Sequence, residues 1–89
     1  MREIIATAAF NEAVEHLGGY RLIDMAMEAI VESLYRDPYG FEKFENDWCS
    51  FRFAKTKRIG VLPPFVVVFT INPGGNVILE HIEEDEELY

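Results

Sequence analysis

Cysteine and tryptophan are scarce in this chain, and each occurs once among its 89 residues. Because Cys49 has no second cysteine to pair with, an intrachain disulfide is excluded, and a solitary thiol is typical of a reducing cytoplasm. The chain also lacks any run of roughly 18 or more apolar residues, the length that a membrane-spanning helix needs. The opening Met1-Arg2-Glu3, followed by only a short apolar run, is not typical of a secretory signal. We therefore expect a cytoplasmic protein that does not enter a membrane.

Histidine is also scarce, and no metal-ligating cluster is visible. The chain has two histidines, His16 and His81, and neither has a second His, Cys or Asp at the spacing of a metal ligand set. The acidic residues near the end of the chain lack the spacing and the central glycine of a calcium-binding loop. We predict no metal site and no cofactor.

Positive charge is the third scarcity, with eight Lys and Arg against sixteen Asp and Glu and a net charge of −8. This field opposes bulk attraction to nucleic acid. The charges are segregated, since the last residues form an acidic tail from about residue 83 while half of the cations fall in one stretch. A solvated turn and a solubilising terminus explain both features, but the cations also suit contact with RNA or with an acidic segment. We term them the basic cluster: Arg52, Lys55, Lys57 and Arg58.

Apolar residues make up 49% of the chain, enough for one core, and we expect residues 1–89 to form a single domain. Residues 2–7 are typical of a short strand, and Thr7 is a suitable N-cap for a first helix. Gly18-Gly19 predicts the end of that helix. Its apolar side chains recur at helical spacing and are Phe10, Ala13, Val14 and Leu17.

A second helix is predicted from about residue 20 to residue 36, where Asp37-Pro38 ends it because the residue before proline disfavours the helical conformation. The short connection between the helices predicts an αα-hairpin. Its expected apolar stripe consists of Leu22, Met25, Ala26, Ala29, Ile30 and Leu34.

Three strands are predicted in the second half, at residues 48–54, 65–71 and 76–82, with a turn at Asn72-Pro73-Gly74-Gly75. Residues 35–46 are expected to be an irregular connection whose aromatic side chains pack against the body. The predicted fold class is therefore α+β: a short N-terminal strand, an αα-hairpin and an antiparallel three-stranded meander that covers the helices.

The strand at residues 65–71 is apolar on both sides. Phe65, Val67 and Phe69 lie on one side, and Val66 and Val68 lie on the other. Two helices can cover only one face of a sheet. Either the sheet curls around its own side chains, or Val66 and Val68 mark a surface that a partner covers.

The order of a strand, two helices and three antiparallel strands resembles the RelE/ParE toxin superfamily. Residues 3–10 are similar to the opening strand and first helix of that family, with its Phe anchor. Residues 41–53 resemble its short element before a strand that carries an arginine, and residues 67–81 resemble its terminal hairpin. The resemblance covers nearly the whole chain and is one of hydrophobicity and order.

Members of this superfamily that cut messenger RNA on the ribosome use basic side chains near the sheet. By resemblance, the catalytic candidates here are the basic cluster and His81. Two cations of the family pattern are missing, because Phe65 is followed by Val66 and His81 by Ile82 where arginines are usual. His81 is not expected to act with Glu80, since neighbouring strand residues point to opposite faces.

The resemblance implies a toxin-like component of a type II toxin-antitoxin system that an antitoxin neutralises. We expect a helix or strand of the antitoxin to cover Val66, Val68 and the basic cluster. Its target would be ribosome-bound messenger RNA, cut weakly and without a metal, or DNA gyrase, whose inhibition needs no nuclease residues. The alternative is a noncatalytic protein-binding module that retains the toxin fold without toxicity. A homodimer is left open.

Overall fold

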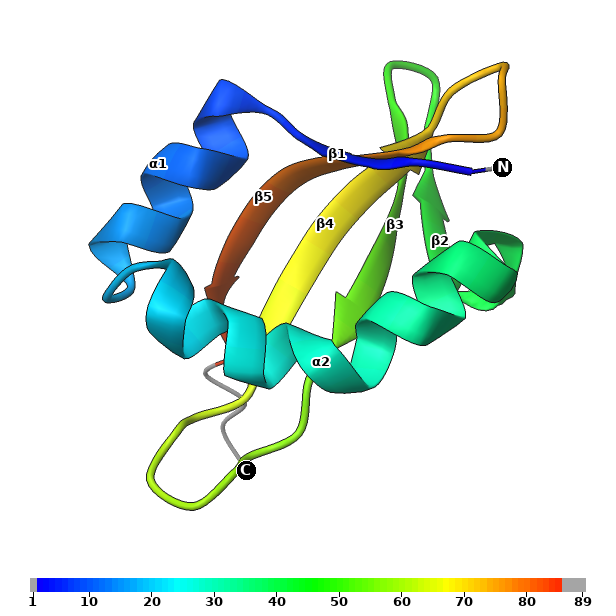
Figure 1. Ribbon diagram of the computed structural model, residues 1–89. Coiled ribbons are helices and arrows are strands. Elements are labelled where there is room, and N and C mark those ends of the chain that lie inside the picture. Colours follow the sequence, from blue (N-terminus) through cyan, green and yellow to red (C-terminus); the bar gives the residue numbers. More distant parts are fainter. Residues whose placement is uncertain (1, 86–89) are drawn as a thin grey trace.

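The computed structural model describes residues 2–85 and shows one five-stranded sheet with both helices on a single face (Figure 1). The strands lie in the order β1-β5-β4-β3-β2. In chain order the elements are β1 (Ile4–Ala6), α1 (Ala8–His16), α2 (Tyr20–Arg36), the 3-10 turn η1 (Pro38–Gly40), β2 (Glu42–Glu45), β3 (Ser50–Lys55), β4 (Phe65–Ile71) and β5 (Val77–Glu84).

The first helix begins and ends as predicted. The hydroxyl oxygen of Thr7 accepts a hydrogen bond from the backbone N–H of Phe10 at 3.1 Å, which satisfies one of the free donors of the first turn. The same hydroxyl donates to the carbonyl of Leu79 at 3.0 Å and so ties the start of α1 to β5. Beyond His16 the chain turns at Gly18, whose φ of 115° strongly favours glycine.

The second helix has the predicted bounds but is rotated from the predicted orientation. Its buried residues are Ile23, Ala26, Met27, Ile30 and Leu34. Leu22, Met25 and Ala29, which were expected in the core, are exposed. The prediction was wrong because α2 carries apolar residues around more than half of its circumference. Contact with the sheet, and not periodicity alone, selects which of them are buried.

The C-terminal hairpin is confirmed. β4 pairs antiparallel with β5, and the turn between them closes with the N–H of Gly75 donating to the carbonyl of Asn72 at 2.9 Å. β5 continues to Glu84, so Glu83 and Glu84 belong to the strand and not to a tail. The acidic residues from position 86 onward lie outside the described residues.

The α+β class is confirmed, but the three-stranded meander was too small a sheet. β1 pairs parallel with β5, and β2 pairs antiparallel with β3, which gives a mixed sheet. β2 lies in the segment expected to be irregular. Its sequence, Glu-Lys-Phe-Glu, has little strand propensity, and its four exposed residues are held in the extended conformation by pairing with β3.

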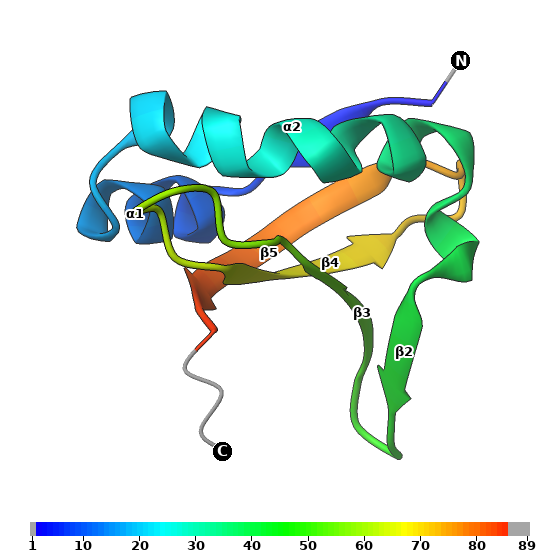
Figure 2. The ribbon, with the colours of Figure 1, turned by 90° about the horizontal axis from the view of Figure 1, so that it is seen from below.

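The core lies between the helices and one face of the sheet. Phe65, Val67 and Phe69 of β4 are buried there as predicted. From β3, Ala54 reaches this core, whereas Phe51 and Phe53 lie on the opposite face. The aromatic side of β3 therefore does not cover the helices. In Figure 2 the β2–β3 hairpin twists away from α2, so its far end stands clear of both helices.

Candidate functional site

The face of the sheet that points away from the helices, termed the open face, is largely apolar. Pairing places Val68 of β4 between Phe53 of β3 and His81 of β5, and Val66 between Lys55 and Glu83. Val66 and Val68 are only partly buried. The apolar residues of the open face are Ile5, Phe44, Phe51, Phe53, Val66, Val68 and Ile78.

An aromatic row crosses the open face at β2 and β3. The rings of Phe44 and Phe51 stack with centroids 5.0 Å apart, and Phe51 meets Phe53 edge-on at 5.4 Å. Phe44 is 42% exposed although it belongs to this row. Within residues 2–85 no helix or strand covers the open face, which presents an apolar surface partly in contact with water.

A β-bulge changes the geometry at one border of the open face. Val68 pairs with His81 and the next residue, Phe69, pairs with Leu79, so Glu80 is an extra residue in β5. Glu80 accepts a hydrogen bond from the hydroxyl of Thr70 at 2.8 Å. Because of the bulge, Glu80 and His81 both lie on the open face, contrary to the expected alternation.

His81 lies closer to a different carboxylate of the open face, since its Nε2 is 3.5 Å from a carboxylate oxygen of Glu83. With Glu80 and Glu83 beside it, this border of the open face is acidic. A ligand for the open face therefore needs apolar groups at its centre and positive charge at the β5 side.

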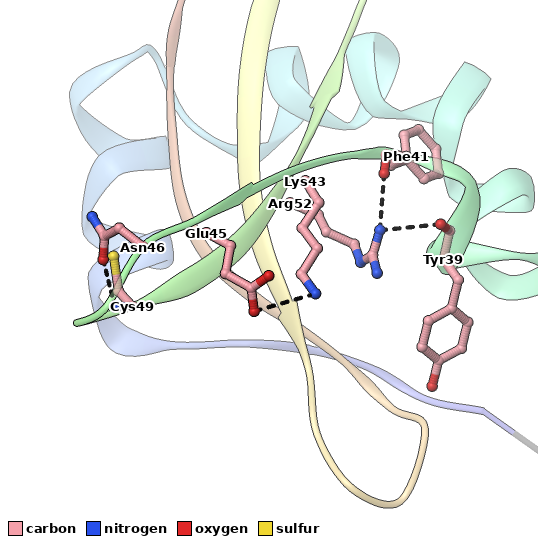
Figure 3. Close-up of polar contacts among 7 residues, drawn as sticks. All are labelled: Tyr39, Phe41, Lys43, Glu45, Asn46, Cys49 and Arg52. Carbon is pink, nitrogen blue, oxygen red and sulfur yellow. Dashed lines mark hydrogen bonds and ion pairs between the residues drawn. The ribbon is translucent and has the colours of Figure 1, made fainter.

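Arg52 occupies a structural position on β3, next to the edge strand β2. Its guanidinium donates from Nη1 to the carbonyls of Tyr39 at 3.1 Å and Phe41 at 3.0 Å (Figure 3). It also lies over the Tyr39 ring, 5.6 Å from the centroid. Arg52 thus holds η1 and the start of β2 against β3. This structural role accounts for the arginine in β3, and contact with a nucleic acid is not needed to explain it.

Beside Arg52 lies an open groove of about 280 Å³. Lys43 lines it from β2, in register with Arg52, and its ammonium lies 3.5 Å from the Glu45 carboxylate (Figure 3). Sequence analysis did not single out Lys43, because it lies outside the basic cluster and only pairing brings it to Arg52. The groove is lined by Tyr39, Lys43, Ser50, Phe51, Arg52, Thr70 and Ile71.

The structure does not bring the basic cluster together. Arg52 belongs to the helix side of β3, whereas Lys55 ends the strand on the open face. Lys57 and Arg58 are exposed in the connection between β3 and β4, which folds back through the bridge between Ile59 and Leu62. These cations are therefore spread along the strand and its following loop, on different sides of the sheet.

This arrangement limits the chemistry that the described residues can perform. Cleavage of RNA through the 2′-hydroxyl needs a proton acceptor and several donors converging on one phosphate. His81 lies on β5 among carboxylates, two strands away from β3 and its cations. Within residues 2–85, no group of three metal-ligating side chains is placed to hold an ion, and no helix is long and apolar enough to cross a membrane.

Comparisons with protein-family models, with curated proteins and with solved structures gave no match to this chain.

Proposed function

We propose that this protein is the toxin-like component of a type II toxin-antitoxin pair and that its principal activity is to bind a partner protein on the open face. The observation that carries the proposal is the apolar surface around Val66, Val68 and the aromatic row, which no helix or strand of the described part of the chain covers. The family resemblance rests on a strand and two helices followed by three antiparallel strands, whereas in the structure four strands follow the helices.

The chemistry of the open face specifies the partner segment. Aliphatic or aromatic side chains would fill the centre, and Lys or Arg would face Glu80 and Glu83 at the β5 border. An amphipathic basic helix or strand of an antitoxin has this character. The net charge of −8 favours association with such a segment over long distances.

The test is co-purification with the product of the neighbouring reading frame. Val68→Asp places a charge at the centre of the open face and should abolish binding. Val61→Asp makes the same change at a side chain that is 99% exposed in the β3–β4 connection, and it should bind normally. Equal binding by the two variants, with both folded by circular dichroism, would contradict the proposal.

Ribonuclease activity is expected to be weak or absent. Removing one donor to the developing charge typically raises a barrier by about 2.7–4 kcal/mol, and here Val66 and Ile82 stand where two arginines are usual. Purified protein should therefore leave translated messenger RNA largely intact. Robust ribosome-dependent cleavage that is lost in Arg58→Ala would show instead that the remaining cations suffice.

Growth and supercoiling assays separate the remaining activities. Growth arrest on expression, with inhibited gyrase supercoiling and intact messenger RNA, would identify gyrase as the target. Normal growth together with partner binding would identify a noncatalytic binding module that retains the toxin fold. The open face serves both functions, so the partner-binding test does not depend on which of them holds.

A further inference from the structure

Among residues 2–85, no strand pairs with the outer edge of β2. β2 is the last strand in the sheet order, and all four of its residues are exposed. Figure 2 shows its hairpin standing away from the helices. At the other end of the sheet, β1 has only three residues, and Arg2 beside it bonds to the carbonyl of Tyr35 in α2 at 2.6 Å. The edge of β2 is thus the more accessible of the two for another strand.

The hydrogen-bond pattern of the hairpin shows which residues supply this edge. The N–H of Asn46 donates inward to the carbonyl of Cys49 at 3.0 Å, in the same register as the β2–β3 pairs. In an antiparallel pair, successive residues alternate between inward and outward backbone groups. Phe44 and Glu42 therefore bond toward β3, while Lys43 and Glu45 turn their N–H and C=O groups outward.

Two copies of β2 can pair antiparallel about a twofold axis only if outward residues face outward residues. One such register places Lys43 opposite Lys43 of the second copy, and another places Glu45 opposite Glu45, so both bring like charges together. The intermediate register places Lys43 opposite Glu45 of the second copy, and Glu45 opposite its Lys43. Opposite charges then meet at both hydrogen-bonded pairs.

The same register places Phe44 on the twofold axis, facing Phe44 of the second copy in a non-hydrogen-bonded pair. Side chains are closest in such pairs. Phe44 is already stacked on Phe51 on the open face. The aromatic row would therefore continue from one copy into the next, and the exposed fraction of Phe44, 42%, would fall.

We propose that the β2 edge binds a second copy of this chain, in the register that pairs Lys43 with Glu45 and Phe44 with Phe44. Charged residues on a strand edge usually discourage pairing with another strand. Here Lys43 and Glu45 of the two copies attract each other in one register and repel each other in the neighbouring ones, so the charges favour that register. The two sheets join into one, and Val66 and Val68 stay accessible. The proposed dimer shares Phe44 with the open face but forms along the outer edge of β2, and it does not rest on the partner-binding function.

Charge reversal tests the proposal through the dimer dissociation constant, measured by sedimentation equilibrium on the full chain. Lys43→Glu puts like charges opposite each other at both pairs and should raise this constant about tenfold, since two attractive cross-strand pairs become repulsive. The double variant Lys43→Glu with Glu45→Lys should restore it. Arg21→Glu makes the same charge change on the exposed side of α2 and should leave it unaltered.

Cysteine cross-linking tests the register. In a Cys49→Ser background, Phe44→Cys should form a disulfide-linked dimer on mild oxidation, because the Cα atoms of a non-hydrogen-bonded pair lie about 4.5 Å apart, within the disulfide range. Lys43→Cys should not, since it faces position 45 of the second copy. A strict monomer at hundreds of micromolar, a dimer indifferent to Lys43→Glu, or equal cross-linking at both positions would overturn the proposal.

Discussion

Truncation of Phe69 tests the assignment of the two faces of the sheet. Phe69 lies near the end of β4, is 0% exposed and meets the ring of Phe41 edge-on at 5.6 Å. Replacement by alanine removes the transfer free energy of a buried ring and leaves a cavity between sheet and helices. Phe→Ala changes of this kind cost about 3–5 kcal/mol. A domain of 89 residues is stable by about 4–13 kcal/mol, so this one side chain accounts for a large fraction of the total.

The assay is urea unfolding followed by circular dichroism. With a denaturant slope on the order of 1.5 kcal/mol per M, the midpoint should fall by about 2–3 M at an unchanged slope. If Phe69→Ala is too unstable to purify, Phe69→Leu retains most of the volume and should show a smaller shift in the same direction.

Val68→Ala is the matched control, because Val68 is the preceding residue of β4 and lies on the open face. It should cost about 1 kcal/mol or less, since its side chain is only partly buried. A cost below about 1 kcal/mol for Phe69→Ala, or an equal cost for both variants, would refute the assignment of the two faces.

Two further predictions concern the helices. Thr7→Ala should lower the free energy of unfolding by about 1 kcal/mol because it removes the N-cap of α1. Thr7→Ser keeps the hydroxyl and should retain most of this stabilisation. Urea unfolding of the two variants checks the prediction. The pKa of Tyr20 is raised above its usual 10.0, first by burial and then by Asp24 and Glu15. As the pH rises, Tyr20 therefore loses its phenolic proton in the unfolded chain before it does so in the folded protein. The contribution of Tyr20 to the free energy of unfolding is complete below about pH 10. It is lost as the pH rises through the higher pKa of the folded state. In unfolding measured across this range, Tyr20→Phe should show a shallower decline than the unsubstituted protein.

Local signals in the sequence determined the order and bounds of several elements. Thr7 and Gly18 bound the first helix because capping and left-handed backbone are properties of single residues. β4 and its turn into β5 were predicted because seven strand-forming residues precede an Asn-Pro-Gly-Gly sequence. The position of Val66 and Val68 on the face opposite Val67 and Phe69 followed from strand alternation.

Tertiary structure decided the features for which the sequence offers two equivalent solutions. Either apolar side of α2 satisfies helical periodicity, and only packing against β4 and β5 buries Ile23 in place of Leu22. β2 is held as a strand by its pairing with β3. Because its residues have low strand propensity, the local sequence did not predict it.

The candidate site depends on tertiary structure for the same reason. The bulge at Glu80 places Glu80 and His81 on the open face together, which the strict alternation of a regular strand does not predict. The basic cluster is compact in sequence but spread in space, because strand pairing commits Arg52 to the carbonyls of Tyr39 and Phe41 while Lys55 lies on the opposite face. Residue type and local spacing determine helix ends, turns and strand periodicity, whereas the face that each side chain occupies depends on partners distant in sequence.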